Sequence, residues 1–126
     1  MKDNKKMSYR PHSPESNNPM VRELLECVIA CETCATASLQ EREVNIMTRC
    51  IELSRECADI CVQTARFMER DSEILPSFLR VCEEACRMCA EECRKHNHEH
   101  CQHCAEVCEH CAEACHEFDG SIELKS

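Results

Sequence analysis

Residues 101–115 read CQHCAEVCEHCAEAC, and within this stretch cysteines recur in alternating steps of three and four residues. An α-helix turns by about 100° per residue, so side chains three and four positions apart share one face. The stretch therefore predicts a helix that carries a stripe of thiols along one side.

The same four-three-four spacing recurs in three earlier segments of the chain. Serines stand at two of the repeat positions in the first two of these segments, Ser38 and Ser54. The four segments together contain all fifteen cysteines of the sequence: Cys27, Cys31, Cys34, Cys50, Cys57, Cys61, Cys82, Cys86, Cys89, Cys93, Cys101, Cys104, Cys108, Cys111 and Cys115. Four helices, each with a thiol stripe, are the expected result.

The composition restricts the fold and the partners. A length of 126 residues suits one domain, and one glycine with 3% aromatic residues leaves little material for strands and hairpins. A net charge of -9, with scattered basic residues, argues against a nucleic-acid partner. We expect no membrane partner either, because no apolar run is long enough to span a bilayer. The N-terminus also lacks the apolar core of a signal peptide, so a cytoplasmic location is predicted.

Turn and cap signals divide the chain. The polar residues 1–19 hold three of the four prolines and are predicted to form a flexible tail. Helices are predicted over residues 20–39, over 42–69, from an N-cap at Asp71-Ser72 to about His96, and from His98–Cys101 to just before Gly120. We expect a bundle over residues 20–119 and a C-terminal tail over 120–126. Short connections make this an all-α, antiparallel, up-down-up-down four-helix bundle with a cysteine-lined core.

The stripes predict two different ends of the bundle. Toward the connection between the second and third helices they continue into a largely apolar plug, formed by Met20, Leu24, Thr64, Met68, Leu75, Phe78, Leu79 and Phe118. Toward the other end they continue into a polar, open mouth formed by Ser38, Met47, His96 and His100.

Other residues lie away from the stripes. His103 and His110 fall well to one side and are expected on the surface. Leu25 and Ile29 point nearly opposite the cysteines of their helix, where a monomer would expose them to water. Such apolar residues favour self-association.

Several roles for the thiols compete. Cysteine packs as a small hydrophobe, but Leu, Ile or Val would bury more apolar surface at every one of these positions. Disulfides within a helix are disfavoured, because Cβ atoms three or four residues apart lie about 5–6 Å from each other and a disulfide needs about 3.5–4.5 Å. A thiol oxidoreductase would place one Cys-x-x-Cys pair at a helix N-terminus after a strand, whereas here several such pairs lie inside helices.

Metal ligation explains the spacing best. Thiolates select soft ions, and Cu(I) is satisfied by two or three sulfurs, so that each helical turn can offer a site. A structural zinc site needs four ligands rather than fifteen, and zinc or cadmium sequestration remains the main alternative. Ferritin-type iron chemistry would need two inward Glu-x-x-His motifs, and the match at Glu113–His116 faces away from the thiols.

With four helices, inward Cys-x-x-x-Cys repeats and histidines at one end, residues 20–118 resemble the bacterial copper storage proteins, and specifically their cytosolic branch. The resemblance implies a binding protein rather than an enzyme, which holds many Cu(I) ions and forms a homotetramer. It makes all fifteen cysteines candidate ligands, with His96, His100 and Met47 as further candidates at the entrance. Ser38 and Ser54 depart from the repeat and leave the ion count and cluster geometry open.

Overall fold

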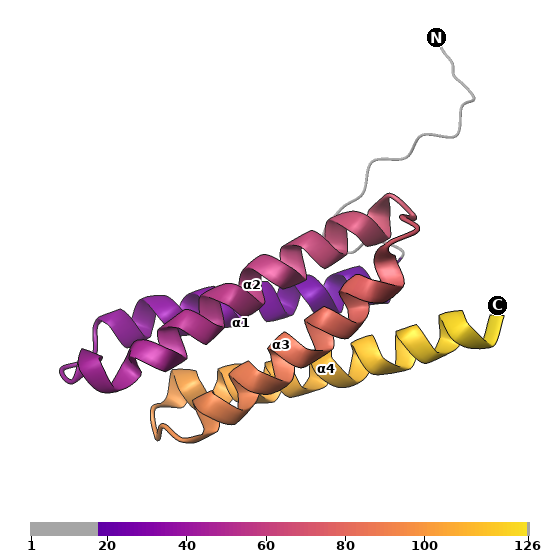
Figure 1. Ribbon diagram of the computed structural model, residues 1–126. Helices are drawn as coiled ribbons and strands as arrows, with labels where there is room; N and C mark the ends of the chain where they lie inside the picture. Colours follow the sequence, from indigo (N-terminus) through magenta and orange to yellow (C-terminus); the bar gives the residue numbers. More distant parts are fainter. Residues whose placement is uncertain (1–17, 126) are drawn as a thin grey trace, which may run out of the picture.

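Four long helices make up the computed structural model, which describes residues 18–125 and the side chains of residues 18–121. Their bounds are α1 Pro19–Leu39, α2 Thr48–Glu69, α3 Leu75–Arg94 and α4 Glu99–Lys125, with a short 3₁₀ helix, η1 Val44–Met47, before α2. Each helix packs against two neighbours, α1 and α3 both lying between α2 and α4. Figure 1 shows successive helices running in opposite directions along the bundle, so the predicted all-α four-helix bundle is confirmed.

The start of α1 follows its sequence signals. The Asn18 side chain accepts a hydrogen bond from the Met20 backbone N–H at 2.9 Å, and Pro19 occupies the first helical position, where its missing N–H costs nothing. The helix begins one residue before the predicted start at Met20. The rest of the predicted N-terminal tail, residues 1–17, lies outside the described residues.

The second helix begins later than predicted. Residues 44–47 form the tighter turn η1, and Glu43 before it has a non-helical backbone with φ -105° and ψ 63°. No side chain caps either η1 or α2 at its start, and Val44 and Ile46 are β-branched residues of low helix propensity. A helix from residue 42 was therefore the wrong prediction, and the connection from α1 is longer than expected.

The Asp71-Ser72 pair ends α2 instead of capping α3. Asp71 has φ 56°, in the left-handed region. Its N–H donates to the Met68 carbonyl and the Ser72 N–H donates to the Phe67 carbonyl, the pattern of a Schellman motif. The Ser72 hydroxyl still accepts a hydrogen bond from the Ile74 N–H at 3.2 Å, just ahead of Leu75. The pair thus forms the C-terminal cap of α2 and the start of the connection to α3.

The fourth helix does not stop at Gly120. It continues through this glycine to Lys125, and Gly120 does not take a positive φ. A glycine ends a helix when it adopts the left-handed conformation, and Gly120 keeps a helical one. The prediction that the helix ends before Gly120 is wrong for this reason.

The apolar plug closes one end of the core as predicted. Leu24, Leu79 and Thr64 are fully buried, and Met20, Met68 and Leu75 are buried around them. Phe78 packs against Phe67 with ring centroids 4.6 Å apart, and both rings, like that of Phe118, are only partly buried. Water is excluded from this end by side chains contributed by all four helices.

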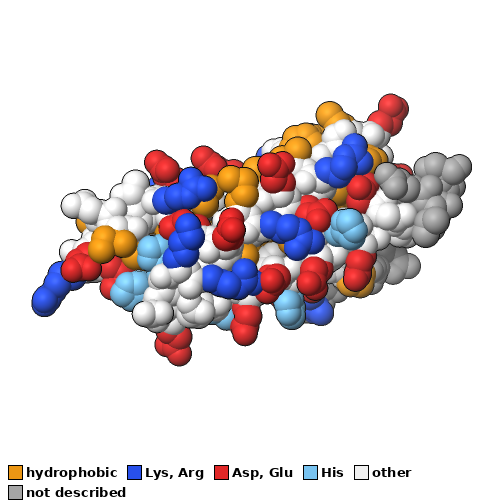
Figure 2. All heavy atoms as spheres, turned by 60° about the horizontal axis from the view of Figure 1, so that its bottom comes forward, with side chains coloured by type: hydrophobic (Ala, Val, Ile, Leu, Met, Phe, Trp, Pro, Cys, Tyr) orange, Lys and Arg blue, Asp and Glu red, His pale blue; other side chains and the backbone are white. Residues whose placement is uncertain are grey.

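The outer surface is densely charged. Ion pairs cross between α3 and α4, Arg94 with Glu109 and Arg80 with Asp119 at 3.4 Å, and Figure 2 shows acidic and basic side chains interleaved on one face. Exposed pairs of this kind contribute little to stability, so the bundle depends on its core. Among the described residues, no helix combines the length and apolarity needed to cross a bilayer.

Replacing Leu79 by alanine tests the plug. Leu79 has no exposed surface, so Leu79→Ala should lower the free energy of unfolding of the reduced, metal-free protein by about 2–5 kcal/mol. The matched control is Val81→Ala on the same helix, a residue 46% exposed, for which we expect a change within about 0.5 kcal/mol. Urea denaturation followed by circular dichroism measures both, and equal effects would contradict the assignment.

Candidate metal centre

All fifteen cysteines are free thiols, and every one of them is buried in the core of the bundle. Their burial follows from the sequence spacing, because each helix turns its thiol stripe toward the other three. The stripes meet along the axis in a column of sulfur atoms, with the plug at one end and the connections α1–α2 and α3–α4 at the other. We call the latter end the mouth.

Four thiols, one from each helix, form the part of the column nearest the mouth. The Cys50 sulfur lies 3.6 Å from that of Cys93, 3.9 Å from that of Cys34 and 3.9 Å from that of Cys101. Cys34 and Cys101 are 3.8 Å apart. We call these four residues the outer thiols.

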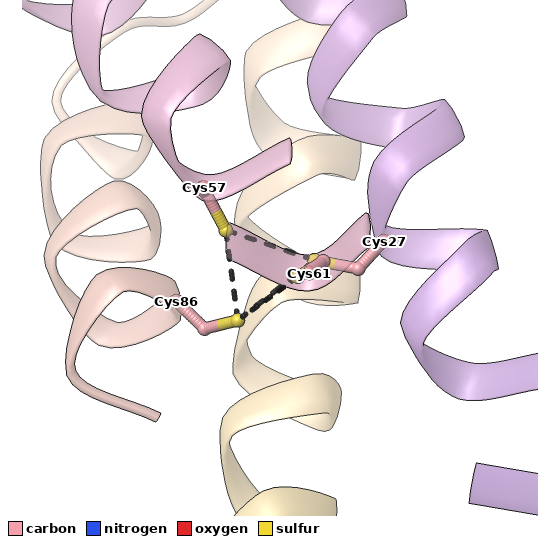
Figure 3. Close-up of side chains that lie close together, drawn as sticks. All are labelled: Cys27, Cys57, Cys61 and Cys86. Atoms are coloured by element: carbon pink, nitrogen blue, oxygen red, sulfur yellow. Dashed lines mark hydrogen bonds between the residues drawn. The ribbon is translucent and has the colours of Figure 1, made fainter. Parts of the chain in front are cut away.

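Deeper in the core the sulfurs form overlapping groups of four. Figure 3 shows Cys27, Cys57, Cys61 and Cys86, contributed by α1, α2 and α3, with their sulfurs turned toward one another. The Cys86 sulfur lies 3.5 Å from that of Cys57 and 3.9 Å from those of Cys27 and Cys61. All four sulfurs are within 4.8 Å of one another.

Further groups share members with this one. Three of them meet the same 4.8 Å limit: Cys27, Cys31, Cys57 and Cys108; Cys31, Cys89, Cys104 and Cys108; and Cys61, Cys82, Cys86 and Cys111. Because each group borrows sulfurs from the next, the thiols form one continuous column rather than separate sites. Cys115 lies one turn beyond Cys111, at the end of the column next to the plug.

The separations suit a shared metal ion. Neighbouring sulfurs lie 3.5–4.0 Å apart, far beyond a disulfide bond of about 2.05 Å. A tetrahedral metal with a metal–sulfur bond of about 2.3 Å places its sulfurs about 3.8 Å apart. Soft ions can therefore enter between these thiols with little movement of the helices.

The charge of the thiolates constrains what the column can hold. Burial and the neighbouring charges of Cys34 and Cys50 raise the pKa of Cys101. Hydrogen bonds from the thiols of Cys104 and Cys50 act in the other direction and lower the pKa of Cys34. Because neighbouring thiolates in a dry core repel one another, extensive deprotonation requires cations among the sulfurs.

His100 is the histidine that meets the thiols. Its Nδ1 atom lies 3.6 Å from the Cys34 sulfur and 3.5 Å from the Cys101 sulfur, and its Nε2 atom lies 2.9 Å from a carboxylate oxygen of Glu41. Burial disfavours the charged imidazolium. The hydrogen bonds and charges of Cys34 and Glu41 favour it more strongly, so the pKa of His100 lies above its usual value. The ring of His98 stacks on that of His100, with centroids 5.3 Å apart, and its Nδ1 lies 3.4 Å from the same Glu41 oxygen.

His96 is held away from the column. Its Nε2 atom lies 3.0 Å from Glu92, a carboxylate that is only 7% exposed and also pairs with Arg49 and Lys95. Burial alone would raise the pKa of Glu92, but the hydrogen bonds from His96 and Lys95 bring it below the usual value. The structure therefore places His96 at the mouth, as expected, with its imidazole engaged by a carboxylate.

The remaining expected residues lie at the mouth or on the surface. Met47 is buried in η1 at the mouth. His103 and His110 are exposed, and so is His116, whose Nδ1 lies 3.2 Å from Glu83 on the surface. The Glu113–His116 motif thus has no place in the core.

Two serines interrupt the sulfur column. Ser38 lies beside the outer thiols, with its hydroxyl oxygen 3.9 Å from the Cys34 sulfur. Ser54 lies deeper, 3.6 Å from Cys89 and 3.9 Å from Cys93. Both serines are fully buried.

Sequence reasoning missed the two carboxylates at the mouth. Glu92 stands four residues before His96 at the end of α3, a spacing from which their pairing could have been inferred. Glu41 reaches His100 from the connection before η1, and no periodic signal marks a loop residue of this kind.

A four-helix bundle whose core is lined with overlapping groups of buried thiols defines the class, a protein that binds soft metal ions through cysteine. The sequence model of the copper storage protein family matches residues 13–120. The chain belongs to that family.

Solved structures agree with the assignment. The chain is 38% identical to copper-free copper storage protein 3 from Bacillus subtilis, with a TM-score of 0.76 over 80% of this chain and 96% of that one. It is 37% identical to the copper storage protein Ccsp from Streptomyces lividans loaded with 10 copper equivalents, with a TM-score of 0.79 over 81% and 82% of the two chains. A 60-residue stretch, 48% of this chain, is also 40% identical to the cysteine-rich protein YhjQ of Bacillus subtilis and spans 56% of that relative's length.

The contact between Glu41 and His100 predicts a measurable pKa. Removing the carboxylate charge in Glu41→Gln should lower the pKa of His100, because Glu41 stabilises the imidazolium. Nuclear magnetic resonance of the His ring protons across a pH series, in the reduced and metal-free protein, measures it. Glu43→Gln, which removes an exposed carboxylate from the same connection, is the control, and an equal shift in both variants would contradict the contact.

Proposed function

We propose that this protein stores Cu(I) at high capacity, in clusters that share thiolates along the column. The observation that supports the proposal is the overlap of the four-sulfur groups. Because neighbouring groups share sulfurs, possible metal sites continue through the whole core instead of forming one isolated four-ligand site. The Cu(I)-bound copper storage protein BsCsp3, 38% identical to this chain over 93% of its own length, supports the choice of metal.

Charge balance favours Cu(I) over divalent ions. One thiolate neutralises one Cu(I), so a column filled with nearly equal numbers of both stays close to neutral in a dry core. Zinc or cadmium, each bound by four thiolates, would leave two excess negative charges at every unshared site, and bridging thiolates would reduce this excess without removing it. Sequestration of zinc or cadmium is the alternative that charge balance disfavours.

We assign the ligands accordingly. All fifteen cysteines are proposed to bind copper, with the bundle of residues 20–119 as the storage unit. His100 adds its Nδ1 atom beside the outer thiols, with Glu41 accepting a hydrogen bond from Nε2, as carboxylates commonly do behind metal-binding histidines. Met47 and His96 are weaker candidates at the mouth, and Glu92 competes for His96.

The proposed role is storage without turnover. A thiol oxidoreductase needs a reactive, partly exposed cysteine, and all fifteen thiols of this chain are buried. A cytoplasmic location is proposed with it, supported by the cytosolic copper storage protein of Streptomyces lividans, 37% identical to this chain. A reducing compartment keeps thiols available for copper.

A homotetramer is proposed as the assembled form. The number of chains follows the family resemblance, and self-association is supported by α1, where Ile29 is 66% exposed and Leu25 is 39% exposed on the side away from the thiols. An apolar pair in this position gains stability when another chain covers it.

Titration of the reduced, metal-free protein with Cu(I) tests the storage function. In competition with a coloured Cu(I) chelator, we expect binding to continue to a stoichiometry near or above the fifteen thiols of each chain. Zn(II) titrated in parallel should stop well below the number of thiols, since each zinc ion needs four ligands. Saturation by one or two copper ions, or loss of helical circular dichroism in the metal-free protein, would contradict storage in a preformed bundle.

Sedimentation velocity tests the assembly. The wild-type protein should sediment as four chains of 14.5 kDa each, and Ile29→Glu should dissociate it because a charge cannot be buried in an apolar contact. Met88→Glu, at a residue 40% exposed on α3, is the control. A wild-type monomer would refute the assignment.

A further inference from the structure

Ser54 occupies a thiol position in the middle of the column. On α2 the stripe runs Cys50, Ser54, Cys57 and Cys61, so the serine separates one outer thiol from the rest of the helix's ligands. Cys50 and Cys57 are seven residues apart, which corresponds to about 10.5 Å along the helix axis. A cysteine at position 54 would place a metal-binding sulfur between Cys50 and Cys57, whereas the serine places none there.

The hydroxyl of Ser54 is a poor substitute for a thiolate. Soft Cu(I) prefers sulfur, and a neutral hydroxyl oxygen is a weak ligand for it. As an O–H donor, Ser54 instead stabilises thiolates nearby, and its oxygen lies 3.6 Å from Cys89 and 3.9 Å from Cys93. The residue therefore supports the ligands of α3 without binding the ion itself.

Short sulfur contacts lead inward beside Ser54, along the neighbouring helix α3 and then α4. Cys93 of the outer thiols lies 3.9 Å from Cys89, which lies 4.0 Å from Cys104. Cys104 in turn lies 3.8 Å from Cys108 and 3.9 Å from Cys31, both members of the deeper groups. This series of thiols passes Ser54 and rejoins the column below it.

We propose that Ser54 forms a constriction in the thiol column, so that Cu(I) passes between the outer and the deeper thiols along α3 and α4, through Cys89 and Cys104. The proposal rests on Cu(I) storage as the function of this chain. It adds to that function a route and a slow step, both set by one residue that is not a ligand.

Each step along the route is a ligand exchange. As Cu(I) moves inward, a copper–sulfur bond to Cys89 forms while a bond to Cys93 breaks. The proton of the thiol that becomes a ligand is taken up by the thiolate that is released, and copper remains Cu(I) throughout. No oxidant or reductant takes part.

Stopped-flow loading of the reduced protein from a coloured Cu(I)–chelator complex tests the constriction. The wild-type protein should load in a fast phase for the outer thiols and a slow phase for the deeper ones. Ser54→Cys should at least double the rate constant of the slow phase, because two equivalent parallel routes double the rate through the step. Ser38→Cys is the matched control, since it makes the same substitution beside the outer thiols, and it should leave the slow phase unchanged.

Cysteine substitutions test the route itself. Cys89→Ser should slow the deeper phase, whereas Cys115→Ser, at the plug, should lower the capacity without changing that rate constant. Helical circular dichroism verifies the fold of each variant, and the Ser54→Cys result decides the proposal if Cys89→Ser does not fold.

The outcomes separate the two proposals. A wild-type capacity of one or two ions would overturn storage itself. A high capacity with a single loading phase, or with equal slow phases in Ser54→Cys and Ser38→Cys, would overturn the constriction alone.

Discussion

Fifteen ionisable thiols share one dry core, and they can lose their protons together only if cations take the protons' place. This charge balance decides whether the core holds protons or metal ions. Without cations the thiols remain mostly protonated and pack as small apolar side chains, which keeps the bundle folded in the absence of metal. With a soft monovalent cation on nearly every thiolate, the same core remains close to neutral. The charge of the core is therefore balanced in both the empty and the filled protein.

The two ends of the bundle give this core a direction. Leu24 and Leu79 seal one end by complete burial, so ions cannot leave there without opening the helices. At the other end His100 stands beside Cys34 and Cys101, with Glu41 behind it. A neutral imidazole, held by a carboxylate at its other nitrogen, is a ligand that suits the end of the bundle open to water. The carboxylate also links the two connections of the mouth to each other.

Much of the fold follows from a local rule. Cysteines repeated in steps of three and four residues can face one way only on a helix, so the helices, their inward faces and the plug were all predictable from the sequence. The connections were not. Asp71 takes a left-handed conformation that closes α2, and η1 delays α2, because hydrogen bonds between backbone groups decide these points rather than side-chain periodicity.

In the site, too, positions on a helix face could be predicted from the sequence, whereas contacts between different elements could not. Extrapolation of the stripes placed His96 and His100 together at the mouth, but it could not show that Glu92 engages one of them while the thiols contact the other. Glu41 belongs to a connection, where neighbours in space are distant in sequence. Ser54 was visible as an interruption, yet its position against Cys89 needed the packing of α2 on α3. Contacts between elements are the part that sequence patterns leave undetermined.

X-ray absorption at the copper edge, on protein loaded to saturation under reducing conditions, distinguishes a shared thiolate column from isolated copper sites. We predict copper in the Cu(I) state, surrounded by two or three sulfur atoms, with neighbouring copper ions detected because thiolates are shared. A first shell dominated by nitrogen or oxygen, or isolated copper ions with no copper neighbour, would contradict storage in a continuous thiolate column.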